Sequence, residues 1–117
     1  MPPIRVHHTT TTNKGWDGST NEARLRDEEN ETYYRKAFAW QDDDADPRTK
    51  TAYRFIHHSV DADGKIGAAN LKAASSGIAV LNGGRRGTTI PKKDRERVYR
   101  HLAAHLKDAG QTPPELE

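Results

Sequence analysis

The chain has no cysteine, one methionine, two phenylalanines and two tryptophans among its 117 residues. The lack of cysteine excludes a disulfide scaffold, a zinc site with thiolate ligands and catalysis by a thiol nucleophile. Hydrophobic residues make up only 32% of the sequence, whereas roughly 45–50% is usual for a globular protein. We therefore expect one small core, with part of the chain extended or buried against a partner.

Long apolar runs are also missing. No stretch approaches the roughly 18–20 apolar residues of a membrane span, and no apolar signal-peptide core follows Met1. The length suits one domain, because domains commonly have about 100–150 residues. These features predict a soluble protein that is made in the cytoplasm and has no membrane partner.

The net charge of +2 gives no overall argument for a nucleic-acid partner, but the charges are unevenly distributed. Residues 15–46 contain ten acidic and four basic residues, and residues 85–108 contain eight basic and three acidic residues. Oppositely charged segments suit pairing within the chain or head-to-tail contact between copies, although two solvated faces would give the same pattern.

The first 15 residues predict an extended N-terminal arm. Pro2 and Pro3 disfavour a helix, and residues 9–15 show no apolar period. Ile4 and Val6 alternate as the buried residues of a short added strand would. Residues 16–117 are expected to form a single small domain.

The first half of this domain is predicted to be polar, with a short strand. Ser19 or Thr20 is expected to cap a helix that reaches about Glu31. Residues 32–40 fit either a helical face or a strand, and we favour a short strand that ends at Trp40. After an acidic turn, residues 51–58 alternate as the clearest strand in the chain.

Two helices are predicted in the second half. The first covers residues 68–82 and ends before Gly83, and the second begins at Pro91 and ends near Asp108. Apolar residues at helical spacing mark the buried stripe of each: Leu71, Ala74, Ile78 and Leu81 in the first, and Val98, Leu102, Leu106 and Ala109 in the second. The predicted fold class is α+β, with two C-terminal helices packed on a short β-sheet and an extended N-terminal arm.

Two segments resemble ligand loops. Asp61 and Asp63 precede Gly64 as in a calcium loop, but the first and twelfth ligands are not carboxylates, so we favour an Asp-Gly turn. Residues 82–89 combine glycines with Arg85 and Arg86, which could hold phosphate. The Gly-Lys-Ser/Thr ending of a nucleotide loop is absent, so a helix end with a flexible turn is the default interpretation.

Four histidines form another candidate site. His101 and His105 are four residues apart on one face of the second helix, where they could bind a divalent metal. Only one of His57 and His58 could join them, because neighbouring strand residues point to opposite faces. We favour structural histidines, with His105 at the rim of the core and His101 on its flank, and we predict no metal or other cofactor.

The sequence offers no credible nucleophile. Ser59 has no glycine-flanked elbow around it, and Ser75 and Ser76 lie within a predicted helix without a nearby base. We therefore predict that the protein is not an enzyme.

A series of short motifs follows in a fixed order along the chain: Trp16-Asp17-Gly18-Ser19, Glu22-Ala23-Arg24, Ala37-Phe38-Ala39-Trp40, Tyr53-Arg54-Phe55-Ile56-His57-His58, Gly67-Ala68-Ala69-Asn70, Leu81-Asn82-Gly83-Gly84-Arg85-Arg86-Gly87, Ile90-Pro91, His101-Leu102-Ala103-Ala104-His105-Leu106, Asp108-Ala109-Gly110 and Pro113-Pro114-Glu115-Leu116. From Trp16 to Leu116 the chain resembles the region downstream of the catalytic part of tailed-bacteriophage prohead proteases. The resemblance implies phage head morphogenesis but not proteolysis, because the protease proper lies upstream of this region. Arg86 stands where that family usually has glycine, which favours a basic contact.

We therefore predict a capsid decoration (cement) or minor capsid protein, made in the host cytoplasm and located on the capsid surface of the virion. It would bind the major capsid protein, and copies could surround a symmetry axis. Strand addition by the arm would anchor it. The expected partner-binding residues are Ile4, Val6, Trp16, Arg85 and Arg86. Trp16 could equally pack onto its own domain.

Two alternatives come from the same sequence. One is a head-maturation accessory factor that leaves the mature particle. The other is a nucleic-acid-binding accessory factor that uses Arg85, Arg86 and the basic second helix. The acidic segment and the lack of aromatic residues among these arginines disfavour nucleic acid as a partner.

Overall fold

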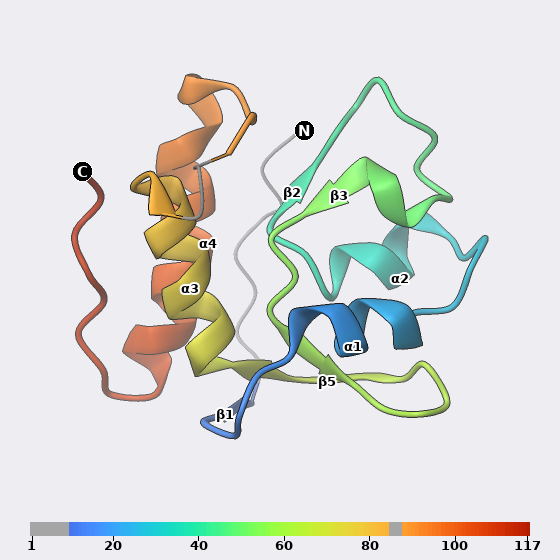
Figure 1. Ribbon diagram of the computed structural model, residues 1–117, viewed down its shortest axis with the longest axis horizontal. Helices are drawn as coiled ribbons and strands as arrows, with labels where there is room; N and C mark the ends of the chain where they lie inside the picture. Colours follow the sequence, from blue (N-terminus) through green and yellow to red (C-terminus); the bar gives the residue numbers. More distant parts are fainter. Residues whose placement is uncertain (1–9, 85–87) are drawn as a thin grey trace.

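The structure is a computed structural model that describes residues 10–84 and 88–117. Four of the predicted partner-binding residues, Ile4, Val6, Arg85 and Arg86, lie outside the described residues. The fold is α+β, as predicted, with two C-terminal helices packed against a small mixed sheet. Figure 1 shows these helices on one side of the molecule and the short N-terminal elements on the other.

The C-terminal helices, α3 (Leu71–Leu81) and α4 (Lys92–Asp108), follow their apolar periodicity. The predicted α3 stripe is buried, and Asn82 and Gly83 end the helix, with Gly83 at a φ of 100°. The α4 stripe is also buried except for Ala109, which is exposed because the helix already ends at Asp108.

The N-terminal elements differ from the prediction. Asp17, and not Ser19 or Thr20, caps α1 (Gly18–Arg24), because its side chain accepts a hydrogen bond from the Thr20 amide at 3.1 Å. The helix ends well before Glu31, and Asn30 caps a separate short helix, α2 (Glu31–Arg35). The expected strand is reduced to β2 (Trp40–Gln41).

The predicted strand over residues 51–58 is broken into pieces of two different sheets. After the 3-10 turn η1 (Lys50–Ala52), β3 (Tyr53–Arg54) pairs antiparallel with β2, while β4 (His58–Val60) belongs to the other sheet. The break lies at Phe55, whose φ of 66° is left-handed and cannot continue a strand.

The second sheet contains a strand that the sequence did not indicate. Residues 66–70, partly assigned to the first predicted helix, form β5 (Ile66–Asn70), which pairs antiparallel with β4 and parallel with β1 (Thr11–Thr12). The strand order is β1-β5-β4. Thr11 and Thr12, which were predicted to belong to the arm, therefore form an edge strand of the domain's sheet, with Thr11 opposite Ala69.

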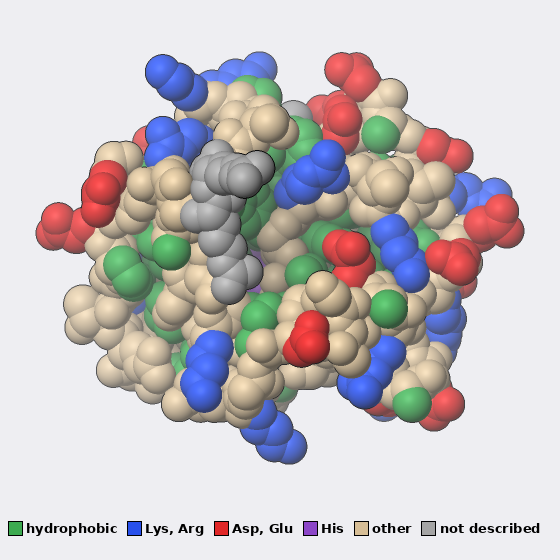
Figure 2. Space-filling model, in the orientation of Figure 1, with side chains coloured by type: hydrophobic (Ala, Val, Ile, Leu, Met, Phe, Trp, Pro, Cys, Tyr) green, Lys and Arg blue, Asp and Glu red, His purple; other side chains and the backbone are tan. Residues whose placement is uncertain are grey.

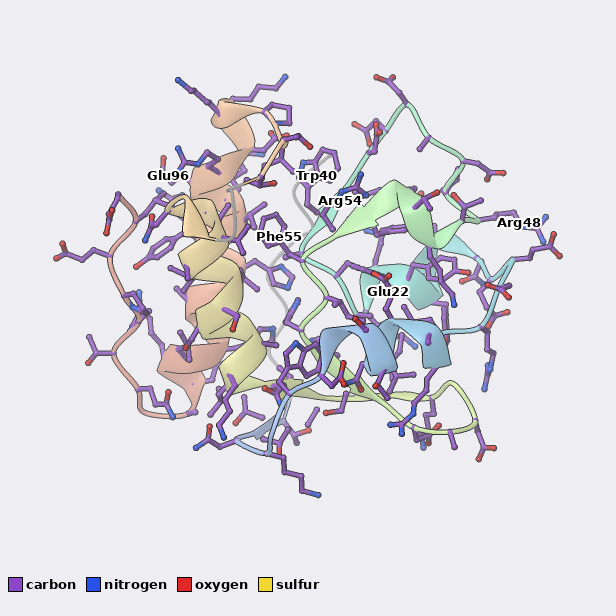
Figure 3. The ribbon with its side chains drawn as sticks, viewed as in Figure 1. Glu22, Trp40, Arg48, Arg54, Phe55 and Glu96 are labelled. Carbon is purple, nitrogen blue, oxygen red and sulfur yellow. The ribbon has the colours of Figure 1, made fainter. Side chains whose placement is uncertain are left out.

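Two apolar clusters form the interior. One contains Trp40 and the buried faces of α3 and α4. The other is rich in aromatic residues: the Tyr53 ring stacks on Phe38 and also contacts the Tyr34 ring. The segment from β3 to β4 passes between the two clusters, and Phe55 packs against the helical one (Figure 3). This crossing segment is the part of the fold that positions both candidate sites.

Candidate functional site

A groove opens at the surface beside α3. It has a volume of about 420 Å³. Its wall combines the Trp16 indole, the Phe55 ring and the half-buried α3 residues Gly77 and Val80. The polar residues of the wall are Arg54, Ser76, Thr88 and Thr89. Trp16 also borders a second hollow of about 480 Å³ on the side of Lys72. The groove is thus made from residues that are far apart in the sequence.

Trp16 is half-buried in this groove, so it packs partly onto its own domain. Its Nε1 atom lies over Gly18, where an added Cβ would be only 3.4 Å away. Trp16 was among the predicted partner-binding residues, whereas its groove neighbours Phe55 and Val80 were not, because apolar residues within predicted strands and helices resemble ordinary core.

The second candidate site is a cluster of four histidines in the interior. His57, His101 and His105 are completely buried, and His58 is 1% exposed. The His57 ring lies 4.6 Å from that of His58 and 4.9 Å from those of His101 and His105, measured between centroids. The predicted positions of His105 at the rim and His101 on the flank are therefore wrong, since both rings are in the core.

As predicted, only one of the two adjacent histidines, His57, joins His101 and His105 in a group whose ligand atoms could hold one metal ion. The reason differs from the predicted one, because the rings of both His57 and His58 pack near His105. The left-handed turn at Phe55 rotates the chain, so the two residues do not alternate across a regular strand. The His58 ring consequently lies 5.3 Å from the His105 ring while His57 contacts both helical histidines.

Backbone carbonyls orient two of the rings. The Nδ1 atom of His57 is 2.9 Å from the Phe55 carbonyl oxygen, and that of His58 is 2.8 Å from the Gly67 carbonyl oxygen. A carbonyl oxygen can only accept, so each Nδ1 carries the hydrogen. In the neutral ring the Nε2 atom then keeps its lone pair.

The environment keeps His57 neutral. Burial holds the pKa of His57 well below its usual range, and the neighbouring His58 and His101 rings lower that pKa further. The hydrogen bond to the Phe55 carbonyl opposes the shift but is the weaker influence. His57 is therefore present as imidazole, the form of histidine that binds metal ions.

The Asp61–Gly64 segment has the geometry of a turn, as favoured from the sequence. One carboxylate oxygen of Asp61 accepts hydrogen bonds from the amides of Asp63 and Lys65, each at 2.9 Å. Gly64 has a φ of 83°, which closes the turn between β4 and β5. The Asp61 side chain is thus occupied by the backbone of its own loop.

The ion pairs between described residues lie within the N-terminal half of the chain or within α4. In the described ranges, ion pairs such as Arg35–Glu31 and Arg100–Glu96 join neighbours on one helix, and none connects the acidic segment to α4. Arg95 donates to the Leu81 carbonyl at the end of α3. Figure 2 shows acidic side chains over the β2–β3 loop and basic ones around the start of α4.

No family model, no curated protein and no solved structure matches this chain. Among residues 10–84 and 88–117, none of the helices has the length and apolarity needed to cross a bilayer.

Proposed function

We propose that this chain is a structural protein of a tailed-bacteriophage head, a decoration or minor capsid protein that binds the major capsid protein at the surface of the virion. The supporting observation is the groove beside α3. Two motifs that carry the resemblance, one beginning at Trp16 and the other at Tyr53, line it together although they are far apart in the chain.

The chemistry of the groove suits a protein partner. Trp16 and Phe55 present aromatic surface to the groove, against which an apolar side chain of the partner could pack. Buried aromatic contacts of this kind contribute much of the binding energy in protein interfaces. We assign the groove to an extended segment of the major capsid protein, because a small hollow with aromatic and polar lining accommodates a few side chains with their backbone and not a flat surface.

The number of copies on a shell makes a small groove sufficient. A single site of about 420 Å³ offers limited contact area, but copies that also touch one another around a symmetry axis bind with a higher effective concentration. In this function the protein binds and reinforces the shell and catalyses no reaction.

The location is tested by mass spectrometry of purified mature virions and of proheads from the phage that encodes the chain. We expect peptides at stoichiometric abundance in mature virions. Peptides in proheads alone would identify a maturation factor, and absence from both particles would overturn a role as a structural component of the head.

The groove is tested by co-sedimentation of purified protein with capsids that lack it. We expect Val80→Asp to abolish binding, because it places a carboxylate in the groove. Ala79→Asp is the matched control, since Ala79 is exposed on the same helix and does not line the groove. Equal binding by the two variants would show that capsids are bound elsewhere.

An anisotropy titration with DNA at low salt tests the nucleic-acid alternative. Phosphate contacts would give an affinity that falls steeply with salt. Salt-sensitive binding without capsid attachment would favour the nucleic-acid function over the proposed one.

A further inference from the structure

The histidine cluster has the composition of a metal site. One ligand atom from each of His57, His101 and His105 lies within 4.8 Å of the other two, and all three residues are completely buried. Three imidazole ligands are a common set for zinc and for chemically similar divalent ions. We propose that His57, His101 and His105 bind one divalent transition-metal ion of the zinc type, which links α4 to the segment between β3 and β4.

The closest pair already has the spacing of two ligands on one ion. The Nε2 atoms of His57 and His101 are 3.2 Å apart. Two nitrogens bound tetrahedrally to zinc at about 2.0–2.1 Å would be about 3.3–3.4 Å apart. The separation of these two atoms therefore already matches two ligands of one tetrahedral ion, and binding requires the rings to tilt toward the ion without moving apart.

The remaining ligand comes from the next turn of the same helix. His101 and His105 are separated by four positions on α4, which places both on the face toward His57. Their ring centroids are 5.5 Å apart. A nitrogen of His105 lies within 4.8 Å of the other two ligand atoms, so the ion requires the His105 side chain to move toward it while the helix backbone stays in place.

The contacts that the ligand residues make on their other sides also support metal binding. A histidine ligand commonly donates its other ring N–H to a carbonyl or carboxylate, which fixes the ring and the tautomer. His57 makes this contact to the Phe55 carbonyl, so its Nε2 lone pair is directed at the other histidines. His58 packs against His57 and His105 and shields the site from the sheet side.

The burial of the cluster indicates a structural role for the ion. None of the four histidines is more than 1% exposed, and none lines the groove beside α3. Three protein ligands leave a fourth position on a tetrahedral ion, which a water molecule would fill. Because the histidines are buried, substrate has no access to that position, and the ion would act on the stability of the fold. A fold with only 32% hydrophobic residues and no disulfide would gain most from such a link.

The test uses the full chain without an affinity tag, with His7 and His8 replaced by serine so that the arm supplies no imidazole. We expect one zinc per chain by elemental analysis after purification. After removal of the ion with a chelator, adding zinc should raise Tm by on the order of 5 °C or more, because a ligand that binds only the folded state stabilises it. Cobalt should give the visible absorption bands of a tetrahedral site.

The control variants separate loss of a ligand from damage to the core. We expect His101→Phe, which keeps a ring of similar size, to weaken zinc affinity at least about tenfold and to remove the Tm response. Val98→Ala on the same helix is destabilised by a cavity, but it should keep both the zinc affinity and the Tm response to zinc. The proposal is wrong if the chain with only His7 and His8 replaced holds no zinc and its Tm does not respond to chelator, zinc or cobalt. Retention of stoichiometric zinc by a folded His101→Phe chain would also overturn it.

Discussion

The Nε2 atoms of His57 and His101 face one another at 3.2 Å, although the residues are 44 positions apart. Since the Nδ1–H of His57 is committed to the Phe55 carbonyl, the His57 Nε2 must accept and the His101 Nε2 must donate. This contact holds α4 against the crossing segment, and it requires His57 to be neutral. Both acidification and metal binding therefore act on the same contact.

The metal-free chain is expected to lose stability in mild acid. Because the folded state holds the pKa of His57 well below its usual range, the unfolded state binds more protons once the pH falls below about 6.5. Stability should be constant above that pH and should then fall by up to about 1.4 kcal/mol per pH unit for this group. Urea unfolding in chelator at several pH values measures the slope. An unchanged slope in His57→Gln would assign the acid sensitivity to other groups.

Part of the fold was predictable because local signals and tertiary packing agree. The ends of α3 and α4 were indicated by Gly83, Pro91 and Gly110. Proline fixes φ at the start of a helix, and glycine readily adopts the positive φ that ends one. The strand β5 was missed because Gly67 and the alanines after it have little strand preference. Their strand geometry comes from pairing with β4 and β1.

The histidine site was only half predictable. The spacing of His101 and His105 placed both on one helical face, but the approach of His57 and His58 together depends on the left-handed turn at Phe55. A bulky aromatic residue rarely adopts this conformation, so nothing in the sequence indicates the turn. The packing of Phe55 against the helical core holds it there.

The backbone at Phe55 gives an unusual order of stability for two substitutions. Both Phe55→Ala and Phe55→Gly remove the ring, but only glycine adopts a φ of 66° without strain. We therefore expect the glycine variant to be more stable than the alanine variant by about 1 kcal/mol, measured by urea unfolding. At Ile56, which has no positive φ, the same pair should show the opposite order. A more stable alanine variant at position 55 would mean that this turn is not left-handed in solution.

A buried indole–carboxylate contact connects the β2 strand to the start of α4. The Trp40 Nε1–H donates to the Asp94 carboxylate at 3.0 Å, and the two residues are only 8% and 5% exposed. We expect Trp40→Phe to cost about 2–3 kcal/mol, because it removes a hydrogen bond to a charged group and leaves the carboxylate buried. Asp94→Asn keeps an acceptor oxygen and should cost less. Chemical denaturation of both variants tests this order, and equal costs would show that the carboxylate charge is not desolvated.

The close contact of α3 with α4 depends on Gly77. An added Cβ at this position would lie 2.7 Å from Cδ1 of Leu102 and 3.4 Å from Cδ1 of Phe55. Alanine improves helix propensity by about 1 kcal/mol, but overpacking a well-filled core costs about 1–3 kcal/mol. Because Leu102 is completely buried and has little room to move, we expect Gly77→Ala to be destabilising overall. Ser76→Ala, at an exposed position of the same helix, should show the propensity gain alone.

In the double variant Gly77→Ala with Leu102→Ala, the new methyl group occupies part of the cavity that the shortened Leu102 side chain leaves. The combined loss of stability should therefore be smaller than the sum of the two single losses by about 1 kcal/mol. Additive losses in urea unfolding would place Gly77 away from Leu102 and contradict this packing of the two helices.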